Sequence, residues 1–240
     1  MRRGNAHDCL VSCSKKFHSL GAASGRYYLF YRPTTVWMGR GLHDQMNALR
    51  QGIRACRLCA DRFAQTETAH EPRPVVWFRT GTPILVAGQA PGARVHESGR
   101  PFTDPSGDRL RHWLGIDETV FYDRDRVSIV PMAFCFPGYD ARNADLPPPA
   151  ICRKTWHDRV MQELGRVPLT VLVGGHAHKF HLGVRGSVTD TVRNWRDHAP
   201  RVFALPHPSW RNTAWLKKNP WFEAELLPVL RARVQEVLND

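Results

Sequence analysis

Short apolar runs alternate with helical patterns along most of this chain, and this alternation limits the fold more than any other feature. Five runs have the length and the flanking glycines or prolines of buried strands, at residues 75–78, 83–87, 127–133, 169–173 and 201–205. Helical patterns occupy residues 42–59, the segment after Asp104, 151–164 and 221–238. Right-handed crossovers would join such strands in parallel, so we expect a three-layer α/β/α sandwich with a mostly parallel central sheet. Ligand loops would then lie at the carboxyl ends of the strands.

The length and composition fit one globular domain. The chain has 240 residues, of which 42% are hydrophobic and 23% charged, as in proteins that fold around one core. Residues 1–41 show no sustained period and predict an irregular arm before a domain at 42–240. No apolar run reaches about 18 residues, and the N-terminus lacks a secretory apolar region. We therefore expect a cytoplasmic monomer with no membrane contact.

The charge balance favours a polyanionic partner. The 34 Lys and Arg residues exceed the 22 Asp and Glu, which gives a net charge of +12. Nucleic acid is the first candidate for such a partner, although charge does not separate DNA from RNA. An Arg-rich surface with no such partner is the alternative interpretation.

Four cysteines have a spacing that suggests a metal centre. Cys56 and Cys59 form a CxxC pair, and Cys135 and Cys152 follow with sixteen residues between them. In a reducing compartment disulfides are disfavoured, and four thiolates are the usual ligands of a 4Fe-4S cluster. A zinc site, a redox CxxC, and unrelated core cysteines remain alternatives. The two cysteines of the arm, Cys9 and Cys13, are interpreted as spare thiols.

Two loops that follow strands have the composition of ligand sites. The segment GQAPG at residues 88–92 comes directly after a strand, and SGRPF at residues 98–102 follows it. Small residues let a ligand approach the backbone, and Phe102 could stack on a flat ring. The third segment, LPHPSWRN at residues 205–212, holds His207 between two prolines at a strand end, where it could stabilise a developing anion. Taken singly, each segment could equally be structural.

Together these motifs resemble the uracil-DNA glycosylase superfamily, and in particular its iron-sulfur branches. In that family a GE(A/G)PG loop is followed by GRPF, then by a cysteine-containing strand end, and finally by an HP(S/A) loop. Residues 88–102 carry GQAPG and GRPF in the same register, and residues 207–209 supply HPS. The order of the four cysteines is also similar. The resemblance covers about residues 47–238.

The resemblance implies hydrolysis of the N-glycosidic bond of a damaged base that is flipped out of DNA. It implies that a neutral His207 stabilises the departing base, that Gln89 binds the base through its backbone and that Phe102 stacks on it. Ala90 and Asn212 would complete the base site. The residues implied in wedging and phosphate contact are Trp210, Arg211, Lys217 and Lys218.

Three positions depart from the family pattern. The second residue of the first loop is Gln89, where the family has Glu. Ala90 stands where other branches keep a water-activating Asp, and the nearest candidates for that role are Glu97, Asp104 and His96. Aligning the chain on Cys135 puts Pro131 where many relatives read the edge of uracil with Asn.

We therefore expect a DNA glycosylase for uracil or another deaminated base. No lysine lies in the motif loops to form a Schiff base, so the enzyme should be monofunctional. The alternative is an iron-sulfur module that binds damaged DNA with little or no turnover. A zinc-stabilised RNA-binding protein would explain the charge and the cysteines, but it gives no reason for the order of the three motifs.

Overall fold

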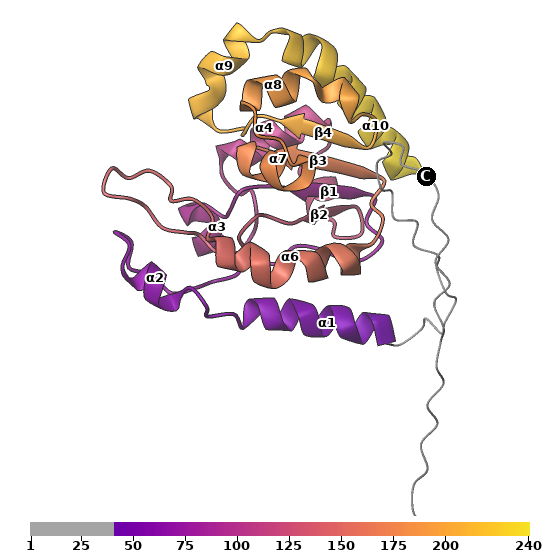
Figure 1. Ribbon diagram of the computed structural model, residues 1–240. Helices are drawn as coiled ribbons and strands as arrows, with labels where there is room; N and C mark the ends of the chain where they lie inside the picture. The colour runs from indigo at the N-terminus through magenta and orange to yellow at the C-terminus, as the bar shows by residue number, and fades with distance from the viewer. Residues whose placement is uncertain (1–40) are drawn as a thin grey trace, which may run out of the picture. The chain divides into compact units, whose positions relative to one another are not determined.

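The computed structural model describes residues 41–240, with side chains from Asn47 onward, and it contains a four-stranded parallel sheet (Figure 1). The strands are β1 Ile84–Ala87, β2 Val127–Ile129, β3 Leu169–Val173 and β4 Val202–Leu205. Their spatial order is β2-β1-β3-β4, so β1 and β3 lie in the centre. The expected α/β fold with a parallel sheet is confirmed. The proposed arm at 1–41, with Cys9 and Cys13, lies outside the described residues except for Gly41.

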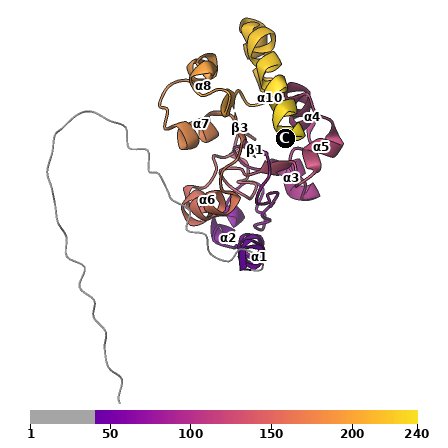
Figure 2. The ribbon, with the colours of Figure 1, turned by 90° about the vertical axis from the view of Figure 1, so that its right-hand side faces the viewer.

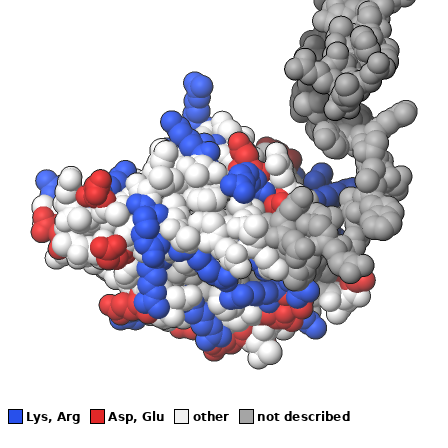
Figure 3. Space-filling model, turned by 90° about the horizontal axis from the view of Figure 1, so that it is seen from below, with Lys and Arg blue, Asp and Glu red and all other residues white. Residues whose placement is uncertain are grey.

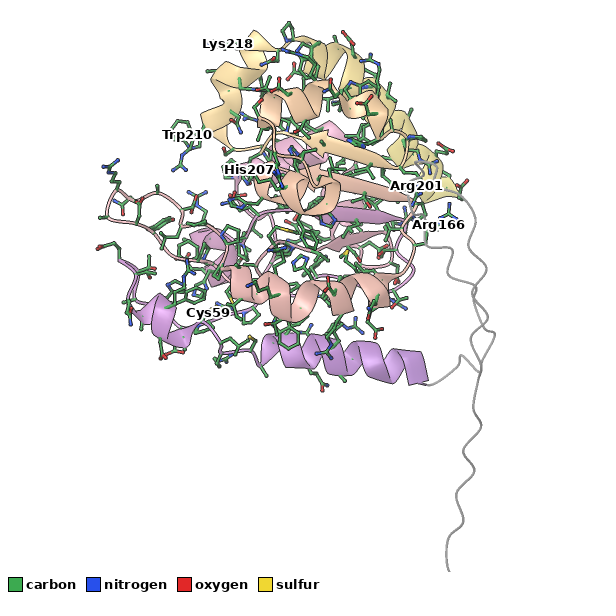
Figure 4. All side chains as sticks on the ribbon, in the orientation of Figure 1. Cys59, Arg166, Arg201, His207, Trp210 and Lys218 are labelled. Atoms are coloured by element: carbon green, nitrogen blue, oxygen red, sulfur yellow. The ribbon has the colours of Figure 1, made fainter. Side chains whose placement is uncertain are left out.

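The register of the sheet brings the strand-following loops to one edge. Ala87 is paired with Leu172, and Val173 with Leu205. Because all strands are parallel, the segments that follow β1, β2 and β4 leave the sheet on the same side. The loop with Gln89 and the loop with His207 therefore flank the end of β3. Figure 4 shows His207 at this edge, with Arg166 and Arg201 at the opposite end of the sheet.

Helices cover both faces of the sheet (Figure 2). The α-helices are α1 Gly41–Arg54, α2 Ala60–Ala64, α3 Ala93–Ser98, α4 Pro105–Leu114, α5 Glu118–Tyr122, α6 Ala150–Leu164, α7 Gly175–Leu182, α8 Val188–Arg193, α9 Thr213–Lys218 and α10 Leu227–Asn239. Shorter helical turns are η1 Trp195–Asp197, η2 Trp210–Asn212 and the π-helical η3 Phe222–Leu226. Within the described range, we find no helix with the length and apolarity needed to cross a bilayer.

Alternate residues of β1 point into two separate cores. Ile84 and Val86 are buried with Trp113 of α4 and Leu230 of α10. Leu85 instead belongs to the cluster that includes Ile53 of α1, and helix α6 supplies Val160 and Leu164 to that cluster. This alternation follows from the two-residue period of a strand, and it explains why the strands read as continuous apolar runs.

Three elements differ from the sequence expectation. The first helix ends at Arg54, so the CxxC pair lies in the turns between α1 and α2. Of the run 75–78, only Trp77 makes a bridge, and it is antiparallel to Ile129. The run 127–133 leaves the ladder after Ile129. The backbone N–H groups of Met132 and Ala133 then donate to the carbonyls of Gly88 and Gln89, which ties this segment to the first motif loop.

Candidate functional site

A cavity of about 500 Å³ opens at the carboxyl ends of β1, β2 and β4. Gln89, Phe102 and His207 all line it, although they are far apart in the sequence. Its other lining residues include Ala90, Pro131, Asp145 and Asn212 together with the rim residues Trp210 and Arg211. A volume of this size falls within the range of small-molecule binding pockets.

The ring of His207 is held in one orientation by its own loop. The backbone N–H of Ser209 donates to Nδ1 of His207 over 3.2 Å, and the side-chain amide of Asn212 donates to the His207 carbonyl over 2.7 Å. A ring nitrogen that accepts a hydrogen bond carries no proton in the neutral form, so the proton lies on Nε2. Burial lowers the pKa of His207, and the nearby carboxylates of Asp104 and Asp145 oppose this in part. A neutral imidazole with Nε2–H is the favoured form.

Phe102 occupies a backbone conformation that its surroundings enforce. Its φ is 55°, in the left-handed region that favours glycine. The Tyr122 hydroxyl donates to the carbonyls of Pro101 and Phe102 over 2.8 and 2.9 Å. Gly107 of α4 admits this carbonyl, because a Cβ there would lie 1.9 Å from the Phe102 oxygen. The half-buried ring packs edge-on against Phe121, with its centroid 5.9 Å away.

Two carboxylates reach the cavity, Asp104 and Asp145. Asp104 precedes α4, and the Ser106 hydroxyl donates to its Oδ1 over 2.5 Å. Asp145 pairs with the Arg211 guanidinium at 3.7 Å. The sequence offered no signal for Asp145, because it lies in a Pro- and Gly-rich loop without periodicity. Glu97, the other candidate carboxylate, is exposed on α3 and is not among the residues that line the cavity.

His96 also lies outside the cavity lining. Its ring meets the ring of His70 edge-on at 5.0 Å, and its Nδ1 is buried without a hydrogen-bond partner. Burial lowers the pKa of His96. The structure thus places His96 behind the first motif loop, whereas Asp104 faces the cavity.

Buried histidines support the cavity walls from behind. Pro131 lines the cavity, and Nε2–H of His157, on α6, donates to its carbonyl over 2.8 Å. Nε2–H of His178, on α7, donates to the Leu205 carbonyl over 3.0 Å, just before the loop of His207. Both rings are fully buried, and burial lowers the pKa of each. At Pro131 the cavity wall is therefore an apolar proline ring, and the carbonyl of this residue is already hydrogen-bonded to His157.

Of the residues expected to contact DNA, two line the rim of the cavity and two lie beyond it on α9. Trp210 is 76% exposed on η2, and its neighbour Arg211 is exposed. Lys217 and Lys218 are exposed near the end of α9. Figure 4 shows Trp210 and Lys218 on the same side of the molecule as His207.

The four cysteines named from their spacing share a second, smaller cavity. Cys56 follows α1, Cys59 precedes α2, Cys135 follows β2 and Cys152 lies in α6; none of them forms a disulfide. Burial, together with the neighbouring thiols, raises the pKa of Cys135 to about 12. Burial also raises the pKa of Cys152 to about 11, although the Phe134 N–H donates to its sulfur.

These thiols share a cavity without converging on one point. Among the side chains that the structure describes, from Asn47 onward, no three of His, Cys, Asp or Glu are grouped so that they could hold a single metal ion. A zinc site needs four sulfurs about 2.3 Å from one ion. In a cubane cluster each thiolate binds a different iron, so the sulfurs lie farther apart. Four free thiols in one cavity are a donor set that either a zinc ion or a 4Fe-4S cluster takes.

One family model matches this chain. Residues 76–231 match the Uracil DNA glycosylase superfamily, which is more than half of the 240 residues. The match includes all three motif loops, whereas Cys56 and Cys59 precede it. Members of this superfamily are DNA glycosylases, which act on DNA. From the matched range, the parallel sheet and the shared cavity of the three motifs, we conclude that the chain belongs to the uracil-DNA glycosylase superfamily.

Proposed function

We propose that this protein is a monofunctional DNA glycosylase that removes uracil or another deaminated base from DNA. One observation carries the proposal: Gln89, Phe102 and His207 line one cavity of about 500 Å³. A flipped base in this cavity would stack on the Phe102 ring and meet the backbone of the Gln89 loop. Ala90 and Asn212 also line this cavity, and the Asn212 amide donates to the His207 carbonyl.

His207 has the protonation state that the departing base requires. When the bond between C1′ and the base nitrogen breaks, its electron pair leaves with the base, and negative charge develops on the base oxygen. A neutral imidazole that donates through Nε2–H stabilises that charge without having to change protonation first. The hydrogen bond from the Ser209 N–H to Nδ1 supports this tautomer.

Asp104 is the proposed acceptor of the proton from water. It faces the cavity, and Ser106 uses only its Oδ1, so Oδ2 remains for a water molecule. The water oxygen would bond to C1′ as its proton passes to the carboxylate. Asp145 is the second carboxylate in the lining, but the Arg211 guanidinium lies 3.7 Å from its Oδ2 and competes with a water molecule for that oxygen.

The residues that line the cavity support a monofunctional enzyme, which removes the base and has no lyase activity. In the part of the chain that the structure describes, no lysine is among the residues that line it. A lyase would need an amine there to form a Schiff base. At the rim of the cavity, the exposed Trp210 would fill the space of the flipped base, and Arg211, with Lys217 and Lys218 beyond the rim, would contact phosphates.

We further propose that Cys56, Cys59, Cys135 and Cys152 hold a 4Fe-4S cluster. When bound, the cluster would cross-link the segment after α1, the segment after β2 and α6. Cys135 lies only two residues from Pro137, which lines the base cavity, so this cross-link would also steady the cavity wall. The function proposed for the cluster is structural.

The activity test uses duplex and single-stranded oligonucleotides that carry uracil, hypoxanthine or xanthine, followed by alkaline cleavage at abasic sites. We expect strand breaks with the wild-type protein, and a rate lower by about a hundredfold or more for His207→Ala. Glu97→Gln is the matched control, because Glu97 lies outside the cavity lining. Tight binding without strand breaks would instead support a damage-binding module.

The cluster test uses absorbance and metal analysis of the purified protein. We expect a brown protein with a broad band near about 400 nm, from thiolate-to-iron charge transfer, and with iron and sulfide in equal amounts. Cys152→Ala should lose the band, and Cys9→Ser should keep it. A colourless protein that contains zinc would contradict the proposal.

A further inference from the structure

We propose that four arginines outside the base cavity form a second DNA-contact surface, which holds undamaged backbone of the bound DNA. The arginine cluster consists of Arg50, Arg54, Arg79 and Arg124. This inference rests on the proposed function in one respect only, since that function identifies the polyanion as DNA. The sequence motifs and the base cavity do not include any of the four residues.

The four guanidinium groups come from three segments that the fold brings together. Arg50 and Arg54 are one turn apart on α1, and Nη1 of Arg50 donates to the Phe78 carbonyl over 3.4 Å, next to Arg79. The guanidinium of Arg124 lies 4.1 Å from the centroid of the Trp77 ring. The α1 helix is thus packed along the segment 77–79, with the arginines along the contact.

Little negative charge balances this cluster. Arg79 pairs with Asp125, whereas Arg50, Arg54 and Arg124 form no ion pair within the described range. Burial lowers the pKa of Arg50, and Arg54 and Arg79 lower it further. Burial also lowers the pKa of Arg124, and the charges of Arg54 and Arg50 lower it further. Uncompensated like charges oppose folding, and a bound polyanion would relieve that repulsion.

The cluster adjoins the wall of the base cavity. Trp77 lines the cavity and its ring also supports the Arg124 guanidinium, so one side chain separates the two sites. Figure 3 shows the face that carries α1, and Lys and Arg side chains run across it. DNA whose damaged base enters the cavity could therefore extend along Trp77 to the cluster.

The chemistry of the cluster favours phosphates over an acidic protein. Guanidinium groups match phosphate geometry, and regularly spaced phosphates can meet several arginines at once. Arg54 is exposed, while the stacking of Arg124 on Trp77 fixes its position without neutralising its charge. A sequence-independent contact is expected, since nothing at this surface reads a base.

The test measures the salt dependence of binding to an undamaged 30-base-pair duplex. The variant is Arg54→Gln with Arg124→Gln, and the matched control is Arg166→Gln with Arg201→Gln (labelled in Figure 4). The control removes the same charge from exposed positions that precede β3 and β4, on the side of the sheet away from β2. Each lost phosphate contact lowers the slope of log K against log salt by about 0.9, so we expect a decrease of about 2 for the cluster variant and none for the control. Arg54→Gln alone removes one exposed charge and should lower the slope by about 1.

The single-turnover rate of base release at saturating enzyme separates this proposal from the proposed function. We expect the cluster variant to keep the wild-type rate, because binding changes and chemistry does not. A wild-type protein that binds duplexes with a damaged base without releasing that base would remove the glycosylase proposal, and the slopes on the undamaged duplex would still decide on the cluster. Equal slopes for the variant and the control would overturn the cluster proposal. Loss of binding to a polyglutamate probe with unchanged DNA slopes would instead assign the surface to an acidic protein.

Discussion

The backbone N–H of Ser209 points at Nδ1 of His207, two residues earlier in the same loop, at 3.2 Å. This contact fixes which nitrogen of the ring carries the proton, and it requires no other side chain. The loop is fixed in turn by the Asn212 amide and by the Arg109 guanidinium, which donates to the Ser209 carbonyl over 2.9 Å. The tautomer of His207 is therefore a property of the backbone of this loop.

Ser209→Pro tests that relationship directly. Ser209 has φ −64°, which proline adopts, but proline has no N–H to donate to Nδ1. Loss of this hydrogen bond should lower kcat by about tenfold, as expected for about 1 to 1.5 kcal/mol of lost orientation. Ser209→Ala keeps the N–H and should retain the wild-type rate. Equal rates for both variants would show that the tautomer does not depend on this contact.

The pKa of His207 should respond in opposite directions to two neighbouring charges. Burial lowers the pKa, Asp145 raises it and Arg211 lowers it. Asp145→Asn should therefore move the titration of the ring to lower pH, and Arg211→Gln should move it to higher pH. The NMR shift of the His207 Cε1–H signal measures both. Shifts of the same sign would mean that the two side chains do not act through their charge.

Gly107→Ala should disturb the position of Phe102. The new Cβ would lie 1.9 Å from the Phe102 oxygen and 2.8 Å from its carbonyl carbon, so the backbone must move. We expect a loss of about 1 to 3 kcal/mol in unfolding free energy, as for other overpacked sites, measured by urea denaturation. Gly186→Ala is the control, because a Cβ there meets nothing within 4 Å. An unchanged midpoint for Gly107→Ala would contradict the close approach.

Acid should destabilise the fold through the half-buried His181. Burial is the main cause that lowers the pKa of His181 from 6.5 to about 4, and the charge of His157 is the second cause. Because the folded state binds the proton less readily than the unfolded state, this contribution is complete above about pH 6.5 and is lost as the pH falls toward 4. The Tm should therefore decrease between pH 7 and pH 5. His181→Leu should decrease less steeply, and an identical pH profile would exclude His181 as a cause.

Local patterns in the sequence were sufficient for the fold class. Buried strands are short continuous apolar runs, and the loops that follow them lie at the carboxyl edge, which pointed to the loops of Gln89 and His207; the roles expected for Gln89, Phe102 and His207 came from the family resemblance. The same patterns did not give the end of α1 at Arg54 or the end of β2 at Ile129. Those ends depend on contacts with other segments, such as the hydrogen bond from Met132 N–H to the Gly88 carbonyl.

By itself, then, the sequence determined the parallel α/β architecture and the identity of the three motif loops, because periodicity and turn chemistry act between neighbouring residues. Only the tertiary structure decided that Asp104 and Asp145 share a cavity with His207. It also decided that His157 hydrogen-bonds the carbonyl of Pro131 from behind the cavity wall. The third such finding is that arginines from α1 and two other segments lie close together near Trp77. Such contacts depend on which strands and helices lie side by side, and no local pattern encodes that arrangement.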